Sequence, residues 1–81
     1  MRVTVRLFAR LRELAGADEI DCEVPEGATV ADVWERMAAD HEGLGAHRRS
    51  VSAAVNAEFA RMETRVGAGD EVAFLPPVSG G

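Results

Sequence analysis

The sequence predicts an α+β fold in which one mixed sheet is covered on one face by one main helix. Residues 2–8 alternate between apolar and polar side chains, which is the period of a strand with one buried face. Residues 30–41 instead place apolar side chains three and four positions apart, as on one face of a helix. A second alternating segment, 71–75, leads into a short C-terminal segment, 76–81. At 81 residues, the chain has the length of one small domain, so we expect a folded domain over 1–75 and an extended tail over 76–81.

The first predicted strand has an apolar side chain at every second position. These inward residues are Val3, Val5 and Leu7. The same alternation places Phe8 on the opposite face, together with two arginines and a threonine. We therefore expect this large ring to be exposed.

A short helix and a second strand follow. Residues 9–15 carry leucines at helical spacing, and Gly16 is a suitable C-terminal stop. Residues 19–24 alternate again and end before Pro25, which cannot continue a ladder of hydrogen bonds. Cys22 falls on the inward face of this strand, between acidic neighbours, which favours a buried structural thiol over a reactive one.

The main helix has a clear start signal. Thr29 is a good N-cap, and Asp32 three residues later nearly completes a capping box. We expect Trp34 to be the central aromatic residue of the core and not a ligand-stacking residue. The apolar stripe of this helix consists of Val30, Val33, Trp34, Met37 and His41.

The second half of the chain predicts a loop followed by three short strands. The loop, 42–50, contains two glycines and an Arg-Arg pair. We expect strands over 51–56, over 59–62 at a sheet edge, and over 71–75. The glycine-rich turn at 66–70 lacks the lysine and the following helix of a phosphate-binding loop, so we assign no ligand to it.

Charge and cysteine content limit the classes of function. The formal net charge of -5 argues against binding to nucleic acid or to an anionic membrane and favours partners with basic docking surfaces. Every basic side chain is arginine, so no side chain of this protein can accept an isopeptide bond. One cysteine permits no internal disulfide, and neither a signal-peptide pattern nor a run of membrane-spanning length is present. We therefore expect a cytoplasmic protein.

No catalytic or metal-binding constellation can be recognised in the sequence. His41 has no histidine, cysteine or carboxylate partner at metal-ligand spacing, and it is interpreted as a residue at the end of the helix. A Ser-His-Asp set, a paired-carboxylate site and a cofactor motif are all lacking. We expect no metal and no cofactor bound by this chain.

Three apolar residues are candidates for a partner-binding surface. If the first and last strands are parallel neighbours, Phe8 and Leu75 lie together on the solvent face, at the point where the tail departs. Phe59, on the predicted edge strand, enlarges this surface. Exposed apolar groups of this kind tend to mark protein–protein interfaces.

The C-terminal tail is the other candidate functional element. Two prolines disfavour helix and favour an extended arm, and two glycines at the end allow another protein to approach the main chain closely. Many chain ends are merely frayed, but a rigid Pro-Pro ahead of Gly-Gly favours a tail that enters a narrow site carboxylate first. The tail consists of Pro76, Pro77, Val78, Ser79, Gly80 and Gly81.

Three segments carry a resemblance that spans essentially the whole chain. They are VRLFARLRELAG at 5–16, AAVN at 53–56 and GDEVAFLPPVSGG at 69–81. They resemble the MoaD family of sulfur carriers, the small subunits of molybdopterin synthase. A Gly-Gly end is shared with other ubiquitin-like carriers, including ThiS, whereas a strand followed by Pro-Pro-Val-Ser-Gly-Gly is similar to MoaD in particular. The resemblance implies a β-grasp, ubiquitin-like fold.

The same resemblance implies a carrier role and not an enzyme on its own. Gly81 would be adenylated with ATP by a MoeB-like adenylyltransferase and converted to a thiocarboxylate with sulfur from a donor protein. A MoaE-like large subunit, in an assembly with two copies of each subunit, would then use this sulfur to build the dithiolene of molybdopterin. Phe8, Phe59 and Leu75 match the hydrophobic interface residues of the family, although Leu75 stands where phenylalanine is common. The loop at 42–50 matches the family poorly.

Two alternatives stay open. One is a ThiS-like carrier that supplies sulfur for thiamine or another metabolite, with a carrier for protein conjugation as a more distant variant. The other is a β-grasp module that binds partners without covalent chemistry and ends in Gly-Gly by coincidence.

Overall fold

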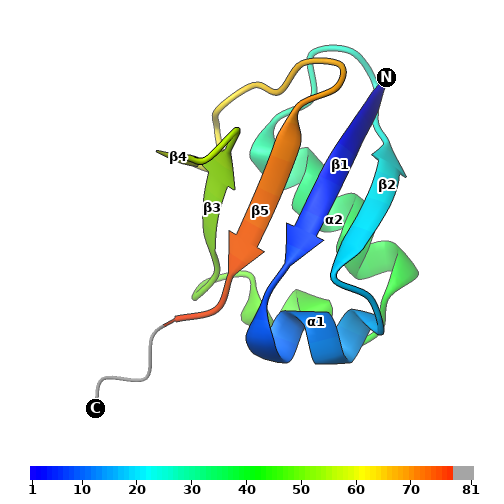
Figure 1. The fold of residues 1–81 in the computed structure, drawn as a ribbon, viewed down its shortest axis with the longest axis vertical. Coiled ribbons are helices and arrows are strands. Elements are labelled where there is room, and N and C mark those ends of the chain that lie inside the picture. The colour runs from blue at the N-terminus through cyan, green and yellow to red at the C-terminus, as the bar shows by residue number, and fades with distance from the viewer. Residues whose placement is uncertain (78–81) are drawn as a thin grey trace.

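Within residues 1–77, the part of the chain that this computed structural model describes, five strands form one mixed sheet. Its spatial order is β2-β1-β5-β3-β4, so the first and last strands along the chain lie side by side at the centre (Figure 1). The strands are β1 (Arg2–Leu7), β2 (Glu19–Glu23), β3 (Ser52–Val55), β4 (Glu58–Ala60) and β5 (Glu71–Leu75). β1 and β5 are parallel neighbours, which is the condition under which Phe8 and Leu75 were expected to lie together, and the other neighbouring pairs are antiparallel.

Helices cover one face of this sheet and leave the other face open. Helix α2 (Val30–Asp40) lies behind the sheet in Figure 1, and the shorter helix α1 (Ala9–Ala15) closes one end of the layer. This one-helix, one-sheet layout is the β-grasp fold that the resemblance implied. Among the residues described, no helix is long and apolar enough to cross a membrane.

The start of α2 has the capping box that its sequence predicted. The backbone N–H of Asp32 donates to the Thr29 hydroxyl at 3.2 Å, and the Asp32 carboxylate accepts from the Thr29 backbone N–H at 2.9 Å. Both bonds satisfy helix N-terminal donors that otherwise lack partners. At the other end, His41 is the C-cap residue, and its Nδ1 lies 3.1 Å from the carbonyl oxygen of Met37. The structure thus confirms the interpretation of His41 as a helix-end residue.

The core lies between the sheet and α2. Trp34 is 1% exposed and meets Phe74 of β5 edge to face, with ring centroids 5.0 Å apart, so it is a core residue as predicted. Cys22 is also buried, and burial raises the pKa of its thiol, which confirms the structural interpretation of this cysteine. The largest fully buried side chains are Trp34, Phe74, Leu7, Leu11, Met37, Leu44, Val3, Val5, Val30, Val33 and Val72.

Several element boundaries differ from the sequence-based expectation. Phe8 is not part of the first strand, because it is the N-cap residue of α1. The predicted edge strand at 59–62 was wrong at both ends, since β4 spans Glu58–Ala60. The reason is the two-residue turn at Asn56 and Ala57, whose positive φ angles of 49° and 71° place Glu58 directly opposite Val55.

The segment predicted as a plain loop, 42–50, contains a short 3₁₀ helix, η1 (Leu44–His47). Leu44 is fully buried and belongs to the core. A single apolar residue among glycines and arginines has no periodicity, so the sequence pattern could not reveal this contribution.

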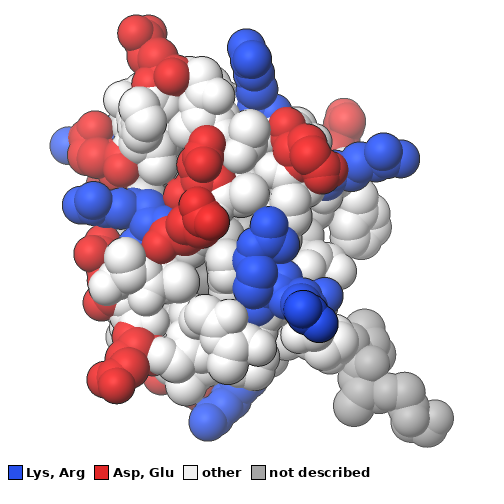
Figure 2. Space-filling view, turned by 180° about the vertical axis from the view of Figure 1, so that it is seen from behind, with Lys and Arg blue, Asp and Glu red and all other residues white. Residues whose placement is uncertain are grey.

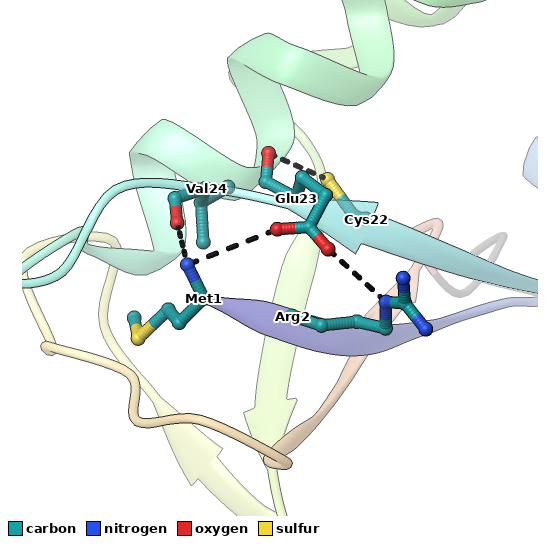
Figure 3. Close-up of polar contacts among 5 residues, drawn as sticks. All are labelled: Met1, Arg2, Cys22, Glu23 and Val24. Atoms are coloured by element: carbon teal, nitrogen blue, oxygen red, sulfur yellow. Dashed lines mark hydrogen bonds and ion pairs between the residues drawn. The ribbon is translucent and has the colours of Figure 1, made fainter.

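Polar contacts tie the beginning of β1 to the end of β2 (Figure 3). The amino group of Met1 donates to the carbonyl of Val24 at 2.6 Å and lies 3.8 Å from the Glu23 carboxylate. Arg2 Nε donates to the same carboxylate at 3.1 Å. Because Arg2 and Glu23 are exposed, this pair contributes at most about 1 kcal/mol to stability.

Candidate functional site: the open face of the sheet and the base of the tail

The open face of the sheet is the one that α2 does not cover. Along β1 and β5 the inward residues are buried, and the residues between them are wholly or partly exposed. The register pairs Leu7 with Phe74 at the inner face, so Phe8 and Leu75 follow at the same level, one residue beyond each. The parallel pairing of β1 and β5 therefore brings Phe8 and Leu75 to the same end of the sheet, as expected for that pairing.

Exposure differs among the three predicted partner-binding residues. Phe59 is 86% exposed and Phe8 is 39% exposed, whereas Leu75 is only partly exposed. Phe59 pairs with Ala54, and Ala54 pairs with Ala73 of β5, so Phe59 is separated from the Phe8–Leu75 end by the width of β3. The three residues share one face, but they do not form one cluster. Phe8 and Leu75 lie at one site, Phe59 lies at another, and small side chains separate the two sites.

The open face has two halves of different chemistry. The half formed by β3, β4 and the C-terminal part of β5 carries small or apolar outward side chains, and we call it the apolar half. Its residues are Ala54, Phe59, Ala73 and Leu75. The half nearer β2 carries charges, and we call it the charged half. Its residues are Arg2, Arg6, Glu19, Asp21, Glu23 and Glu71.

Arg6 lies where the two halves meet. Its guanidinium is 4.0 Å from the Glu19 carboxylate and 3.7 Å from the Glu71 carboxylate. The same group lies over the Phe8 ring, 5.7 Å from the centroid, at cation–π distance. The sequence does not reveal this arrangement, because Glu71 is diagonal to Arg6 across two neighbouring strands and lies 65 positions away from it in the chain.

The opposite side of the molecule is different. Seen from the side of α2, charged groups of both signs are spread over the surface (Figure 2). One exposed pair on α2, Arg36 with Asp40, lies at 3.4 Å. A surface of mixed charges is typical of a solvated face, so the open face is the better candidate for partner binding.

The tail begins where β5 stops. Pro76 is half-buried and Pro77 is exposed, and neither has a backbone N–H, so the ladder of β5 cannot continue past Leu75. Figure 1 shows the chain leaving the sheet at this end, next to α1 and the end of β1. The other predicted tail residues, Val78, Ser79, Gly80 and Gly81, lie outside the described residues.

A hydrogen-bonded clasp holds the other end of β5. Asn56 exchanges two bonds with the backbone of Glu71, through its own N–H at 2.8 Å and through its side-chain oxygen at 3.0 Å. Its amide nitrogen also donates to Asp70 at 3.0 Å, and Asp70 accepts from the Gly67 backbone N–H at 2.7 Å. The Gly67 bond, followed by the Asn56 bond, lowers the pKa of Asp70 below its usual value. The sequence marked Asn56 and the 66–70 segment as turns, but it did not indicate that the two turns bind each other.

In the described part of the chain, neither a pocket nor a group of side chains suited to hold a metal ion is found. What the described residues offer is a surface: an apolar half, a charged half, and the base of a tail at one end. This arrangement is suited to docking against another protein.

Comparison with known proteins identifies the group to which the chain belongs. The sequence profile of the ThiS family matches residues 5–81. A molybdopterin synthase sulfur carrier subunit from Chlamydomonas reinhardtii is 36% identical over the full length of both chains. The corresponding subunit of Escherichia coli is 39% identical, over 98% of this chain and 99% of the other.

The fold also matches known structures. The crystal structure of SAMP1 from Haloferax volcanii, a small archaeal modifier protein, superposes with a TM-score of 0.87. That match is 32% identical in sequence and covers all of both chains. Since the family profile, the relatives and the fold agree along nearly the entire sequence, the chain belongs to the ThiS family of ubiquitin-like β-grasp proteins.

Proposed function

We propose that this chain is the sulfur carrier subunit of a molybdopterin synthase. The observation that carries the proposal is the similarity, along the whole chain, to subunits of that name in an alga and in a bacterium. The open face and the position of the tail support it, because a carrier needs a docking surface beside a terminus that can reach into its partner. In this role the chain is a subunit and not an enzyme by itself.

The chain divides into two parts with separate tasks in this proposal. Residues 1–75 form the folded domain that partners recognise, and residues 76–81 form the arm that presents Gly81. The prolines stiffen the base of the arm, and Val78 to Gly81 thread into the partner's active site. Phe8, Phe59 and Leu75 supply apolar contacts to the large subunit.

The chemistry resides at the carboxylate of Gly81. A carboxylate is a poor acyl donor, so an adenylyltransferase first joins it to the α-phosphate of ATP and releases pyrophosphate. Sulfur from a donor protein, at the oxidation level of sulfide, then displaces AMP and leaves a thiocarboxylate. This group is ionised and nucleophilic at neutral pH, so its sulfur can attack an electrophilic carbon of the pterin precursor and displace an oxygen substituent from that carbon, without a catalytic base on this chain. Hydrolysis of the resulting thioester leaves sulfur on the product and restores the carboxylate.

Each carrier delivers one sulfur atom, and the dithiolene of molybdopterin contains two. Two charged carriers are therefore used for each product, which suits a complex with two copies of each subunit. The large subunit supplies the pterin site and the acid–base groups. ATP is used by the activating partner, and the carrier itself requires no bound cofactor.

Reconstitution tests the proposal. The thiocarboxylated chain is incubated with the pterin precursor, with and without the large subunit, beside a matched chain that lacks Gly81. We expect product only with the complete chain and the large subunit together. Product from the small chain alone, or sulfur delivered only to a thiazole synthase, would overturn the assignment. Intact-mass analysis of the chain from its native host should also find sulfur in place of one terminal oxygen.

A second candidate is a protein modifier, because SAMP1 has the same fold over its entire length. Both roles begin with the same activation of Gly81, and they differ in what receives it. Affinity purification of the tagged chain under denaturing conditions distinguishes them. Covalent conjugates on lysines of other proteins would favour the modifier role, whereas free thiocarboxylated chain favours the carrier role.

A further inference from the structure

Building on the proposed function, we propose that Glu71 binds a basic side chain of the large subunit and thereby sets the register of docking. Glu71 belongs to a group of three charged side chains on the open face, Glu19, Arg6 and Glu71, which we call the triad. It lies beside the apolar half, within the surface that docking would cover. The partner implied is a protein surface with an apolar patch flanked by an arginine or a lysine.

The triad is not balanced in charge. One guanidinium lies between two carboxylates, at 4.0 Å from Glu19 and 3.7 Å from Glu71, which leaves one net negative charge. Both distances exceed normal hydrogen-bond lengths, so neither carboxylate is saturated by Arg6. The side chain of Glu71 is 46% exposed, which leaves its oxygens accessible to a second donor.

The position of Glu71 relative to the tail is fixed by one strand. Glu71, Ala73 and Leu75 are successive outward residues of β5, and the tail begins directly after Leu75. Four residues of strand span about 13 Å. A basic residue that pairs with Glu71 would therefore lie about 13 Å from the point where the tail leaves the sheet.

Glu71 is also held in place before any partner arrives. Asn56 forms hydrogen bonds with both the N–H and the carbonyl of Glu71, so the backbone of Glu71 is fixed at the start of β5. Arg6 is in turn positioned over the Phe8 ring. A preorganised group loses little conformational freedom on binding, which favours its use as a recognition element.

Burial of an unbalanced charge explains why the partner residue must be basic. Covering the open face removes water from the triad, and a net negative charge in an interface is costly unless an opposite charge is supplied. One arginine or lysine on the partner would balance the triad. The charged half carries four carboxylates against two arginines, so it would also steer a basic partner toward this face.

Calorimetric titration with the large subunit of the same organism tests the inference. Glu71→Lys should weaken binding by at least about tenfold, because it replaces attraction by repulsion at a covered site. The matched control is Glu35→Lys, which makes the same charge change on the exposed face of α2 and should alter the affinity by less than about threefold. The isosteric Glu71→Gln serves if the lysine variant folds poorly, and its affinity should depend less on salt than that of the native chain.

The outcomes separate this inference from the proposed function. If the native chain binds and transfers sulfur but Glu71→Lys binds no worse than Glu35→Lys, the inference is wrong and the carrier role stands. Equal salt dependence for Glu71→Gln and the native chain would also overturn the inference. If the native thiocarboxylated chain yields no product with the large subunit, the proposed function fails first, and the inference falls with it.

Discussion

The two faces of the central strands β1 and β5 differ in burial. On β1 and β5, one set of alternate residues, including Val5 and Phe74, is fully buried against α2. The residues between them, including Arg6 and Ala73, face outward and remain partly exposed. Inward residues can be changed only at a cost in folding, while outward residues are free to serve recognition. The difference teaches that alternate positions of the same strands can encode stability and, in the proposed role, docking.

The strongest test of this division is to truncate the largest inward aromatic residue. Trp34→Ala should lower the free energy of unfolding by about 3 to 5 kcal/mol, since it removes a buried indole and its contact with Phe74. Phe59→Ala is the matched outward change, and it should alter stability by less than about 0.5 kcal/mol because the ring is 86% exposed. Urea denaturation of both variants measures the change in the free energy of unfolding. Equal losses would show that the two faces are not independent.

The converse test introduces charge on the outward face. Phe59→Asp should weaken binding to the large subunit by about 2 kcal/mol or more, because it removes an apolar anchor from the interface. Its thermal unfolding should stay close to that of the native chain. Calorimetric titration measures the affinity, and a thermal scan of the same sample measures stability. Unchanged affinity would show that Phe59 is not part of the docking surface.

A smaller effect, on the pH dependence of stability, is expected from the clasp between Asn56 and the turn at 66–70. The pKa of Asp70 is lowered in the folded state by the Gly67 and Asn56 hydrogen bonds, so the ionised form is the stabilised one. This contribution is present above the ordinary aspartate pKa and is lost as the pH falls through the lower folded value. Acid unfolding of Asp70→Asn should therefore depend less on pH in that range. Asp18→Asn, which also removes one exposed carboxylate, is the matched control.

The smallest expected effect concerns the β3–β4 turn, which sets the register of Phe59. Ala57 has a φ of 71°, a conformation that favours glycine, and Asn-Gly is the preferred pair for such a turn. Ala57→Gly should raise stability by about 1 kcal/mol. Its affinity for the large subunit should not change, because the turn type and the position of Phe59 are kept. Loss of stability would mean that the methyl group of Ala57 contributes more than its backbone strain costs.

Local patterns were enough to predict most of the fold. The alternation at Val3, Val5 and Leu7 predicted β1, and the stripe through Trp34 predicted α2 with its capping residue. The buried thiol of Cys22 followed from the alternation of residues 19–24. The exposure of the Phe8 ring was predicted from the alternation of residues 2–8, although the structure places Phe8 at the N-cap of α1. These features depend on neighbours within one turn of helix or one strand, so the local sequence contains the information that determines them.

The tail was predicted from its residues alone, and the structure describes only its first two residues. Pro76 and Pro77 lack a backbone N–H, so the end of the β5 ladder at Leu75 was predictable without knowledge of packing. The prediction for Val78 to Gly81 lies outside the described residues. The resemblance to a sulfur carrier family rested chiefly on this ending, and the comparison of the whole chain confirms the family.

Only the tertiary structure decided what lies across the strands. The burial of Leu44, the register of β4, the clasp between Asn56 and Asp70, and the position of Glu71 beside Arg6 all join segments that are not neighbours in sequence. Such contacts depend on which strands pair and in which register, and many pairings satisfy the same alternation of apolar and polar residues. The sequence by itself therefore determined which face of each strand is buried, whereas packing of distant segments decided which outward residues meet and so where a partner can bind.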